Sequence, residues 1–214
     1  MLKADLHIHS KYSMDSRNEP EEIVKRCQKL GLTCVAIADH DAVQGGLEVQ
    51  KIAPFKVIVA EEVLTMSGEV MGMFLKERIA GGIPLEKAID AIREQGGLVN
   101  IPHPFDPVRG LRLNAAEFEK LAPKIDMMEV FNARVLSKQT NIKAAAFAKA
   151  HNLPGTAGTD SHTIQEIGGV MLELNDFNTP QEFLAALKSA TIEGKLASPF
   201  VHFYSTIAKM KKAF

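Results

Sequence analysis

The sequence predicts an α/β protein with a distorted (β/α)7 barrel, formed as one domain over residues 1–214. Two observations predict this fold. Short apolar runs typical of strands alternate with amphipathic helical segments, which is the pattern of successive βα units and a mostly parallel sheet. About seven such units follow one another without a linker or a low-complexity segment, which favours a closed or distorted barrel over an open doubly wound sheet.

The apolar runs that predict strands are six to eight residues long. They cover residues 2–9, 32–38, 56–63, 70–75, 97–102, 125–131 and 153–158, with an eighth expected at 170–175. Helical patterns cover residues 19–31, 45–53, 84–97, 114–122, 136–152 and 179–190. The last helix is expected to begin with Thr179 as its N-cap and Pro180 in its first turn. The final ten residues or so are expected to form a loose tail or a helix, with the KMKK run at 209–212 solvated.

The composition restricts the class of partner. The chain is 46% hydrophobic and 24% charged, with a formal net charge of −1. This near-neutral balance gives no electrostatic reason to expect long nucleic acid or an anionic membrane surface as a partner. No signal-peptide core or 18-residue apolar run is present, and the two cysteines have no CxxC spacing. We expect a cytoplasmic protein that binds a small molecule, with its oligomeric state left open.

Histidines and carboxylates gather where the predicted strands end. His7 and His9 lie on the first predicted strand, in DLHIHS. Side chains alternate along a strand, so these two imidazoles point to the same side and could converge on one metal ion. A polar strand end with two hydrogen-bonded histidines would explain this pair equally well.

The other strand ends weaken that alternative. In a parallel βα barrel the carboxyl ends of the strands share one face, so residues distant in sequence become neighbours there. The strand-end set comprises Asp5, His7, His9, Asp39, His40, Asp41, Glu61, Glu62, His103, Asn132, Asp160 and His162. Without a cation such a set would leave buried charges uncompensated. Mixed imidazole and carboxylate ligands suit Zn²⁺, Mn²⁺ or Fe²⁺, and they exceed what one tetrahedral ion needs, so we expect two to three divalent metal ions.

Two histidines are excluded from this set. His151 is expected at the C-terminus of a helix, where a partly charged imidazole favours the helix dipole, and we interpret it as structural. His202 has no partner at a strand end.

The motifs DLHIHS, IADHD, a glutamate ending a strand, IPHP and GTDSH occur in this order from residue 5 to about residue 162. Together they resemble the signature of the PHP (polymerase and histidinol phosphatase) superfamily of metal-dependent phosphoesterases. The resemblance implies a distorted seven-stranded βα barrel with a trinuclear metal site.

The resemblance also implies a ligand set. His7, His9, Glu62 and Asp160 would bind the first metal; Glu62 would bridge to a second metal held also by His103; His40, His162 and Asp15 would hold the third. Glu62 is preferred over Glu61 because the family's carboxylate precedes an aliphatic residue, here Val63.

The sequence departs from the family at one ligand. Family members often carry a further histidine on the strand after this glutamate, and the aligned residue here is Met71, a poor ligand for these cations. Glu69 lies close enough in sequence to substitute, or water could fill the position. The residues expected to support the ligands are Asp5, Asp39, Asp41 and Asn132.

The expected reaction is hydrolysis of a small phosphomonoester, a nucleotide or similar, by a hydroxide that bridges two metals. Arg134, in FNAR, is the first candidate to bind phosphate oxygens and Arg109 the second, while His162 is the candidate to protonate the leaving alkoxide. The alternatives are a histidinol-phosphatase-like enzyme, a short-oligonucleotide phosphoesterase and a non-catalytic metal-binding barrel. An amidohydrolase-type enzyme also carries HxH on its first barrel strand, but IADHD and GTDSH fit that class poorly.

Overall fold

The computed structural model describes residues 1–198 and 200–212, apart from the side chain of His202. Within these residues nine strands form one sheet in the order β7-β6-β5-β4-β3-β2-β1-β8-β9. The strands are β1 Leu2–Ile8, β2 Cys34–His40, β3 Lys56–Thr65, β4 Gly68–Met73, β5 Leu98–Ile101, β6 Met127–Asn132, β7 Gly155–Gly158, β8 Val170–Leu174 and β9 Thr191–Gly194. The helices are α1 Pro20–Leu30, α2 Gln44–Ile52, α3 Leu85–Glu94, α4 Ala115–Leu121, α5 Lys138–Ala150, α6 Pro180–Leu187 and α7 Val201–Lys212, with a 3₁₀ turn at Ala122–Lys124.

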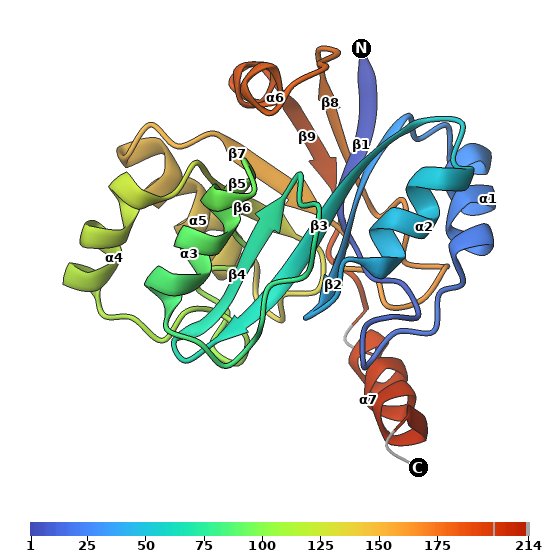
Figure 1. The fold of residues 1–214 in the computed structure, drawn as a ribbon, viewed down its shortest axis with the longest axis horizontal. Coiled ribbons are helices and arrows are strands. Elements are labelled where there is room, and N and C mark those ends of the chain that lie inside the picture. The colour runs from blue at the N-terminus through green and yellow to red at the C-terminus, as the bar shows by residue number, and fades with distance from the viewer. Residues whose placement is uncertain (199, 213–214) are drawn as a thin grey trace.

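The sheet curls into a nearly closed barrel. Helices α1 and α2 pack on one side and α3 to α5 on the other (Figure 1). Closure takes place beyond β7, where Ile8 pairs with Ser161 and the His9 amide donates to the Ser161 carbonyl at 3.0 Å. The predicted α/β barrel is therefore confirmed, and each predicted strand and helix is present with its bounds shifted by a few residues.

The expectation of a mostly parallel sheet is corrected. Four strand pairs are parallel and four are antiparallel in the described sheet. The antiparallel pairs arise because β4 returns from β3 as a hairpin and because β8 and β9 extend the sheet beyond β1. The six strands β1, β2, β3, β5, β6 and β7 still run in one direction, so their carboxyl ends share one face. Since β4 runs the opposite way, its first residues, not its last, lie at that face.

The barrel interior follows the period-two alternation of the strands. Ala36 and Ala38 on β2 and Ile58 and Ala60 on β3 point into the main apolar core, and the next residues of the same parity are His40 and Glu62. Residues of the opposite parity pack against the covering helices. The apolar core residues and the polar strand-end residues thus lie on the same inward-facing side of each strand, one following the other.

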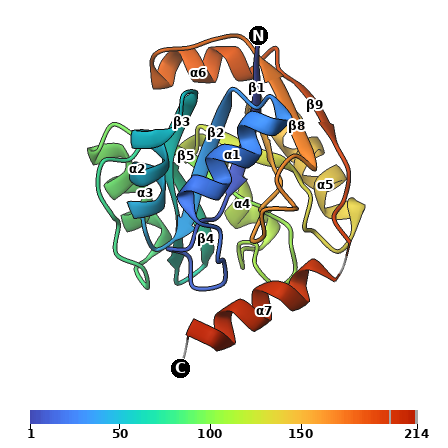
Figure 2. The same cartoon turned by 90° about the vertical axis from the view of Figure 1, so that its right-hand side faces the viewer.

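The start of α6 and the C-terminal segment test two further expectations. Thr179 caps α6 by accepting a hydrogen bond from the Glu182 amide at 3.2 Å, as predicted. Of the two alternatives for the C-terminal residues, the described part forms a helix, α7, which crosses the face where β1 ends (Figure 2). The KMKK run at 209–212 lies exposed on this helix. Lys212 donates to the carbonyl of Ser13 at 2.6 Å and to that of Lys11, and Ala208 is buried. No described helix has the length and apolar character needed to cross a membrane.

The close approach of β7 to β1 requires glycine at position 158. A Cβ there would lie 2.2 Å from the Cβ of His7. We predict that Gly158→Ala lowers the free energy of unfolding by about 1–3 kcal/mol, because the overpacked strands must move apart. Urea denaturation would measure this loss. Gly169→Ala serves as the control, because its Cβ would come no closer than 3.3 Å to a neighbour; equal losses for both variants would contradict the packing argument.

The two cysteines are free and buried. Burial raises the pKa of both the Cys27 and the Cys34 thiol to about 12. We predict that neither thiol reacts with Ellman's reagent at pH 8 in the folded protein, since almost no thiolate is present and access is blocked. Both should react once guanidinium unfolds the chain. Rapid reaction of one thiol before unfolding would show that its helix or strand opens locally.

Candidate metal centre

The shared face brings all the predicted metal ligands into one cluster. In the described residues four overlapping groups have ligand atoms within 4.8 Å of one another: His7, His9 and Asp160; His7, Glu62 and His103; His40, Glu62 and Glu69; and His9, His40 and His162. Asp15 lies outside these groups but contacts two of their members, His40 and His162. The ligands come from six separate segments of the chain.

The first group surrounds the Nε2 atoms of His7 and His9, which lie 3.1 Å apart. Asp160 Oδ1 lies 3.2 Å from His9 Nε2 and 3.8 Å from His7 Nε2. Glu62 Oε2 lies 3.5 Å from both nitrogens. The four side chains assigned to a first metal therefore face one small volume.

The second group is centred on Glu62 and His103. Glu62 Oε1 lies 2.8 Å from His103 Nε2, and its other oxygen faces His7 and His9, so this carboxylate can bridge two ions. Glu69 Oε2 lies 3.4 Å from the same His103 nitrogen. Met71 pairs with Glu62 across the hairpin, and its sulfur receives the Asn100 amide at 3.5 Å inside the apolar core. The position that Met71 leaves without a ligand is therefore reached by Glu69.

The side chains assigned to the third metal, His40, His162 and Asp15, lie nearer the opening than the two sets above. Asp15 Oδ2 lies 3.6 Å from His40 Nε2, and Asp15 Oδ1 lies 3.2 Å from His162 Nε2. The carboxylate spans the two imidazoles, and its half-buried position leaves this group the most accessible of the three.

Hydrogen bonds to Nδ1 orient three of the imidazoles. His7 Nδ1 lies 3.0 Å from Glu129 Oε1, His9 Nδ1 lies 2.8 Å from Ser13 Oγ, and His162 Nδ1 lies 2.8 Å from the Asp160 carbonyl oxygen. Since a carbonyl or carboxylate only accepts, the proton of His7 and His162 resides on Nδ1. The Nε2 lone pair of each ring then faces the cluster, which is the tautomer a metal ligand requires.

Glu129 contacts two of the candidate ligands, and the sequence did not indicate it. Besides orienting His7, it accepts hydrogen bonds from the His103 amide at 2.7 Å and from Asn132 Nδ2 at 2.9 Å. It is 2% exposed, so it links two ligands inside the barrel. The available signal was a carboxylate inside the apolar run MMEVF, with the inward parity of Met127.

Three of the predicted supporting residues contact the ligands or their loops. Asn132 Nδ2 also donates to Asp160 at 3.2 Å. Asp5 accepts from the amide and hydroxyl of Thr159, at 2.9 and 2.6 Å, and so holds the segment before Asp160. Asp39 accepts from the hydroxyl of Ser13, the partner of His9, at 3.0 Å.

Asp41 and Glu61 make other contacts. Asp41 accepts from the Leu64 amide at 3.2 Å at the end of β3, and its own amide donates to the carbonyl of Glu62 at 3.1 Å, so its supporting role stays a prediction. Glu61 points to the opposite side of β3 from Glu62 and accepts from the Ile79 amide at 2.8 Å. The preference for Glu62 over Glu61 agrees with this geometry.

Two ligands occupy strained backbone positions. His103 has a φ of 27° and Asp160 a φ of 54°. Residues other than glycine adopt this left-handed region at a cost of about 1–2 kcal/mol, and such strain concentrates at functional sites. Here it turns both side chains inward just after a strand ends.

The donor set fits divalent cations. Oε2 of Glu62 and Oε2 of Glu69 are buried and accept no hydrogen bond from a described residue. Burial and the electrostatic effect of the neighbouring histidines lower the pKa of His9 to about 3, which leaves its imidazole neutral. Burial and the charge of Glu62 raise the pKa of Glu69 to about 7. Divalent ions would relieve this crowding of carboxylates and supply partners for the free oxygens.

A cavity of about 230 Å³ opens above the ligands. Asp15, His40, Glu69 and His162 line it together with both predicted phosphate-binding arginines. Arg109 pairs with Asp160 and with Asp106, the latter at 3.1 Å. Arg134 is 3% exposed and pairs with Glu166 at 2.8 Å, so the structure places it at the cavity and not on a solvent-facing helix.

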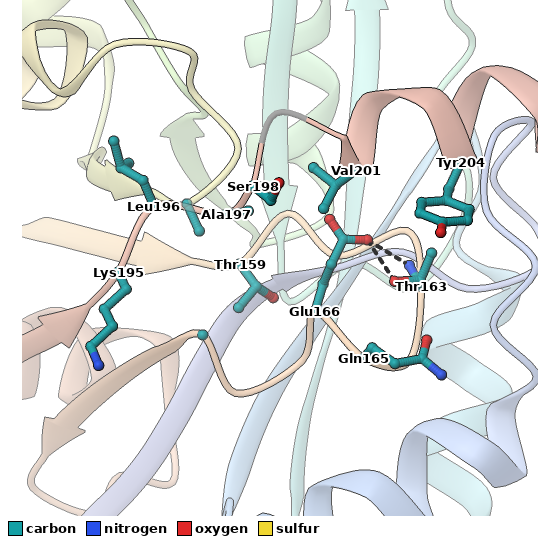
Figure 3. A pocket seen from close by; sticks show the side chains of 12 residues that line it. Thr159, Thr163, Gln165, Glu166, Lys195, Leu196, Ala197, Ser198, Val201 and Tyr204 are labelled. Carbon is teal, nitrogen blue, oxygen red and sulfur yellow. Dashed lines mark hydrogen bonds between the residues drawn. The ribbon is translucent and has the colours of Figure 1, made fainter.

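Glu166 also fixes the loop that carries Asp160 and His162. It accepts from the amide and hydroxyl of Thr163, each at 2.9 Å (Figure 3), and from the His162 amide at 3.1 Å. One carboxylate therefore connects Arg134 to a ligand loop. His151, by contrast, lies at the C-terminus of α5 and pairs with Glu119 at 3.3 Å, which is a structural role as predicted.

Comparisons with known proteins agree with this geometry. Residues 138–192 match a family model described as PHP-associated. An uncharacterized protein of Methanocaldococcus jannaschii is 35% identical over 203 residues, which are 90% of this chain and 81% of the relative. A solved two-domain protein from Bacteroides vulgatus, described as containing a predicted PHP-like metal-dependent phosphoesterase, superposes with a TM-score of 0.75 at 16% identity, over 97% of this chain and 69% of that one. The chain belongs to the PHP superfamily.

Membership in the PHP superfamily confirms the resemblance of the five motifs. It does not by itself choose a reaction. A solved protein from Chromobacterium violaceum, described as an amidohydrolase with bound sulfate and no metal, has a TM-score of 0.66 at 19% identity, over 89% of this chain and 97% of that one. Since proteins with different descriptions share this barrel, the reaction must be argued from the side chains.

Glu129 allows a test of the site independent of any reaction. We predict that Glu129→Gln lowers the free energy of unfolding of the chelator-treated protein by about 1–3 kcal/mol, because an amide nitrogen replaces one buried acceptor. It should also weaken divalent-metal binding by about 10–100-fold, since His7 and His103 lose their orientation. Urea denaturation and calorimetry would measure the two effects. The exposed Glu94→Gln is the control, and wild-type metal affinity in Glu129→Gln would contradict the role assigned to Glu129.

Proposed function

We propose that this PHP protein is a metal-dependent phosphoesterase that hydrolyses a small phosphomonoester, such as a nucleotide. The observation that carries the proposal is the overlap of the ligand groups beside a cavity lined by arginines. Mixed imidazole and carboxylate donors are typical of hydrolytic metal centres, and guanidinium groups are typical phosphate ligands.

The proposed ligands are those grouped above. His7, His9, Glu62 and Asp160 would hold one ion, Glu62, His103 and Glu69 a second, and His40, His162 and Asp15 a third. Two to three Zn²⁺, Mn²⁺ or Fe²⁺ ions held in this way would supply a water nucleophile at neutral pH and neutralise charge on the phosphoryl oxygens.

The chain's own residues would bind and orient the substrate. Arg134 is held by Glu166 with its guanidinium at the cavity, so it is pre-positioned for phosphate oxygens. Arg109 lines the same cavity from the opposite loop. His162 Nε2 can bind a metal or, as an imidazolium, donate a proton to the leaving alkoxide, but it cannot do both at once.

The size of the cavity supports a small substrate. About 230 Å³ is below the roughly 300–1,000 Å³ of sites that enclose a drug-sized ligand. A phosphate with a small alcohol suits this volume better than an oligonucleotide does.

The proposal predicts hydrolysis that depends on the metal centre. The purified protein supplied with Mn²⁺ should hydrolyse p-nitrophenyl phosphate or a nucleotide monoester, and His9→Ala should reduce the rate to background because it removes a ligand. His151→Ala, outside the site, should retain the wild-type rate. Equal rates for His9→Ala and wild type would refute the ligand assignment.

Metal analysis and a substrate screen separate the alternatives. We expect two to three ions per chain by elemental analysis. A screen with Mn²⁺ across nucleotides, histidinol phosphate and short oligonucleotides should give its highest rate with a small phosphomonoester. Bound metal with no phosphoester hydrolysis would favour a non-catalytic barrel, and a best substrate outside phosphoesters would overturn the proposal.

A further inference from the structure

Helix α7 forms part of the wall of the site cavity. Ser205 and Lys209 line the cavity together with the candidate ligands Asp15, His40 and Glu69. The helix crosses the carboxyl ends of the strands (Figure 2), so its inner side faces the metal ligands. A segment distant in sequence from every motif therefore borders the same space as the proposed chemistry.

Lys209 differs from the other cations that line this cavity. Arg109 is paired with Asp106 and Asp160, and Arg134 with Glu166. Lys209 forms no ion pair or hydrogen bond through its side chain within the described part of the chain. An ammonium that borders a cavity and is not already compensated is available to an incoming anion.

The contacts of α7 place Lys209 at this position. Arg134 donates to Ser205 Oγ at 2.9 Å, one turn before Lys209. Lys212, less than one turn after it, donates to the carbonyl of Ser13, whose hydroxyl orients His9. Lys209 is thus held between two contacts that both lead to the site.

The rest of α7 is packed loosely. A cavity of about 580 Å³ separates its first turn from the loop of Thr159 to Gly169, with Val201 and Tyr204 on one side and Glu166 on the other (Figure 3). Phe203, Tyr204 and Met210 are largely exposed. The helix is anchored mainly by the Ser205 and Lys212 contacts, and their opening would let it move aside for substrate entry and product release.

We propose that Lys209 binds the non-reacting phosphate oxygens of the substrate and that α7 thereby closes over small phosphomonoesters. Lys209 supplies a positive charge from the side opposite the metal ligands, and α7 excludes bulky esters while it is in place. The identity of the anion as a substrate phosphate rests on the proposed function; the presence of an anion site at Lys209 does not.

Equilibrium binding of inorganic phosphate tests this assignment without turnover. In calorimetric titrations of the Mn²⁺-loaded protein, Lys209→Ala should weaken phosphate binding by about tenfold or more, as expected for the loss of a charged hydrogen bond. Lys209→Arg should keep the affinity within a few-fold of wild type. Lys211→Gln is the matched control, because it removes one positive charge from the same helix and Lys211 lines a different cavity.

Each result has a defined meaning. A selective loss in Lys209→Ala, restored by arginine, supports the proposal. Equal affinities for wild type and Lys209→Ala, or equal losses in the Lys209 and Lys211 variants, overturn it, since the first shows no contact and the second shows only general electrostatics. Lys209→Ala and Lys211→Gln should both unfold at the wild-type urea midpoint. Failure of the proposed function is recognised separately, by phosphate binding that depends on Lys209 in a protein that hydrolyses no phosphoester.

Discussion

The structure depends on one electrostatic constraint, the confinement of many ionisable groups at the carboxyl ends of the strands. Five imidazoles and four carboxylates face one another there, most of them with almost no exposure to water. In such surroundings each unpaired charge is costly, so each group must have a partner or change its protonation state. Glu129, Asn132, Asp39 and Asp5 supply hydrogen bonds that hold the outer atoms of the cluster. The remaining ligand atoms face one another at the centre of the cluster, where bound divalent cations would compensate the carboxylate charges.

The same constraint explains the shape of the barrel below the site. Ala38 and Ala60 are paired across β2 and β3 and occupy the interior positions just beneath His40 and Glu62, where larger side chains would push the strands apart. Larger core residues lie beside small ones in register, since Met73 pairs with Ala60 and Ile58 pairs with Ala36. Small residues therefore let the sheet close tightly enough to bring ligands from different strands within a few ångströms.

Much of the fold and of the ligand set could be predicted from the sequence, because both depend on local patterns. The alternation of strands and helices is read from hydrophobic periodicity, and His7, His9, His40, His103 and Asp160 stand out as polar residues at strand ends. Glu129 could not be recognised in this way, since its role depends on which side of β6 faces His7. Strand β9 was not predicted, and the C-terminal helix was predicted only as an alternative to a loose tail, without its position beside the site. β9 is a short, exposed strand that gains its structure from pairing with β8, and α7 from contacts with distant loops.

The β3–β4 hairpin has a consequence for where the second metal would sit. Met71 and Glu69 lie two residues apart on β4 and therefore share a face of the strand. Moving the donor from position 71 to position 69 shifts its backbone origin by about 6–7 Å toward the opening. The Glu69 side chain reaches back to place Oε2 3.4 Å from His103 Nε2, so a carboxylate oxygen stands beside the other candidate ligands from a shallower anchor. Where the family resemblance implies a deep nitrogen donor, this barrel offers an oxygen donor anchored nearer its rim, which would favour a harder ion at that position.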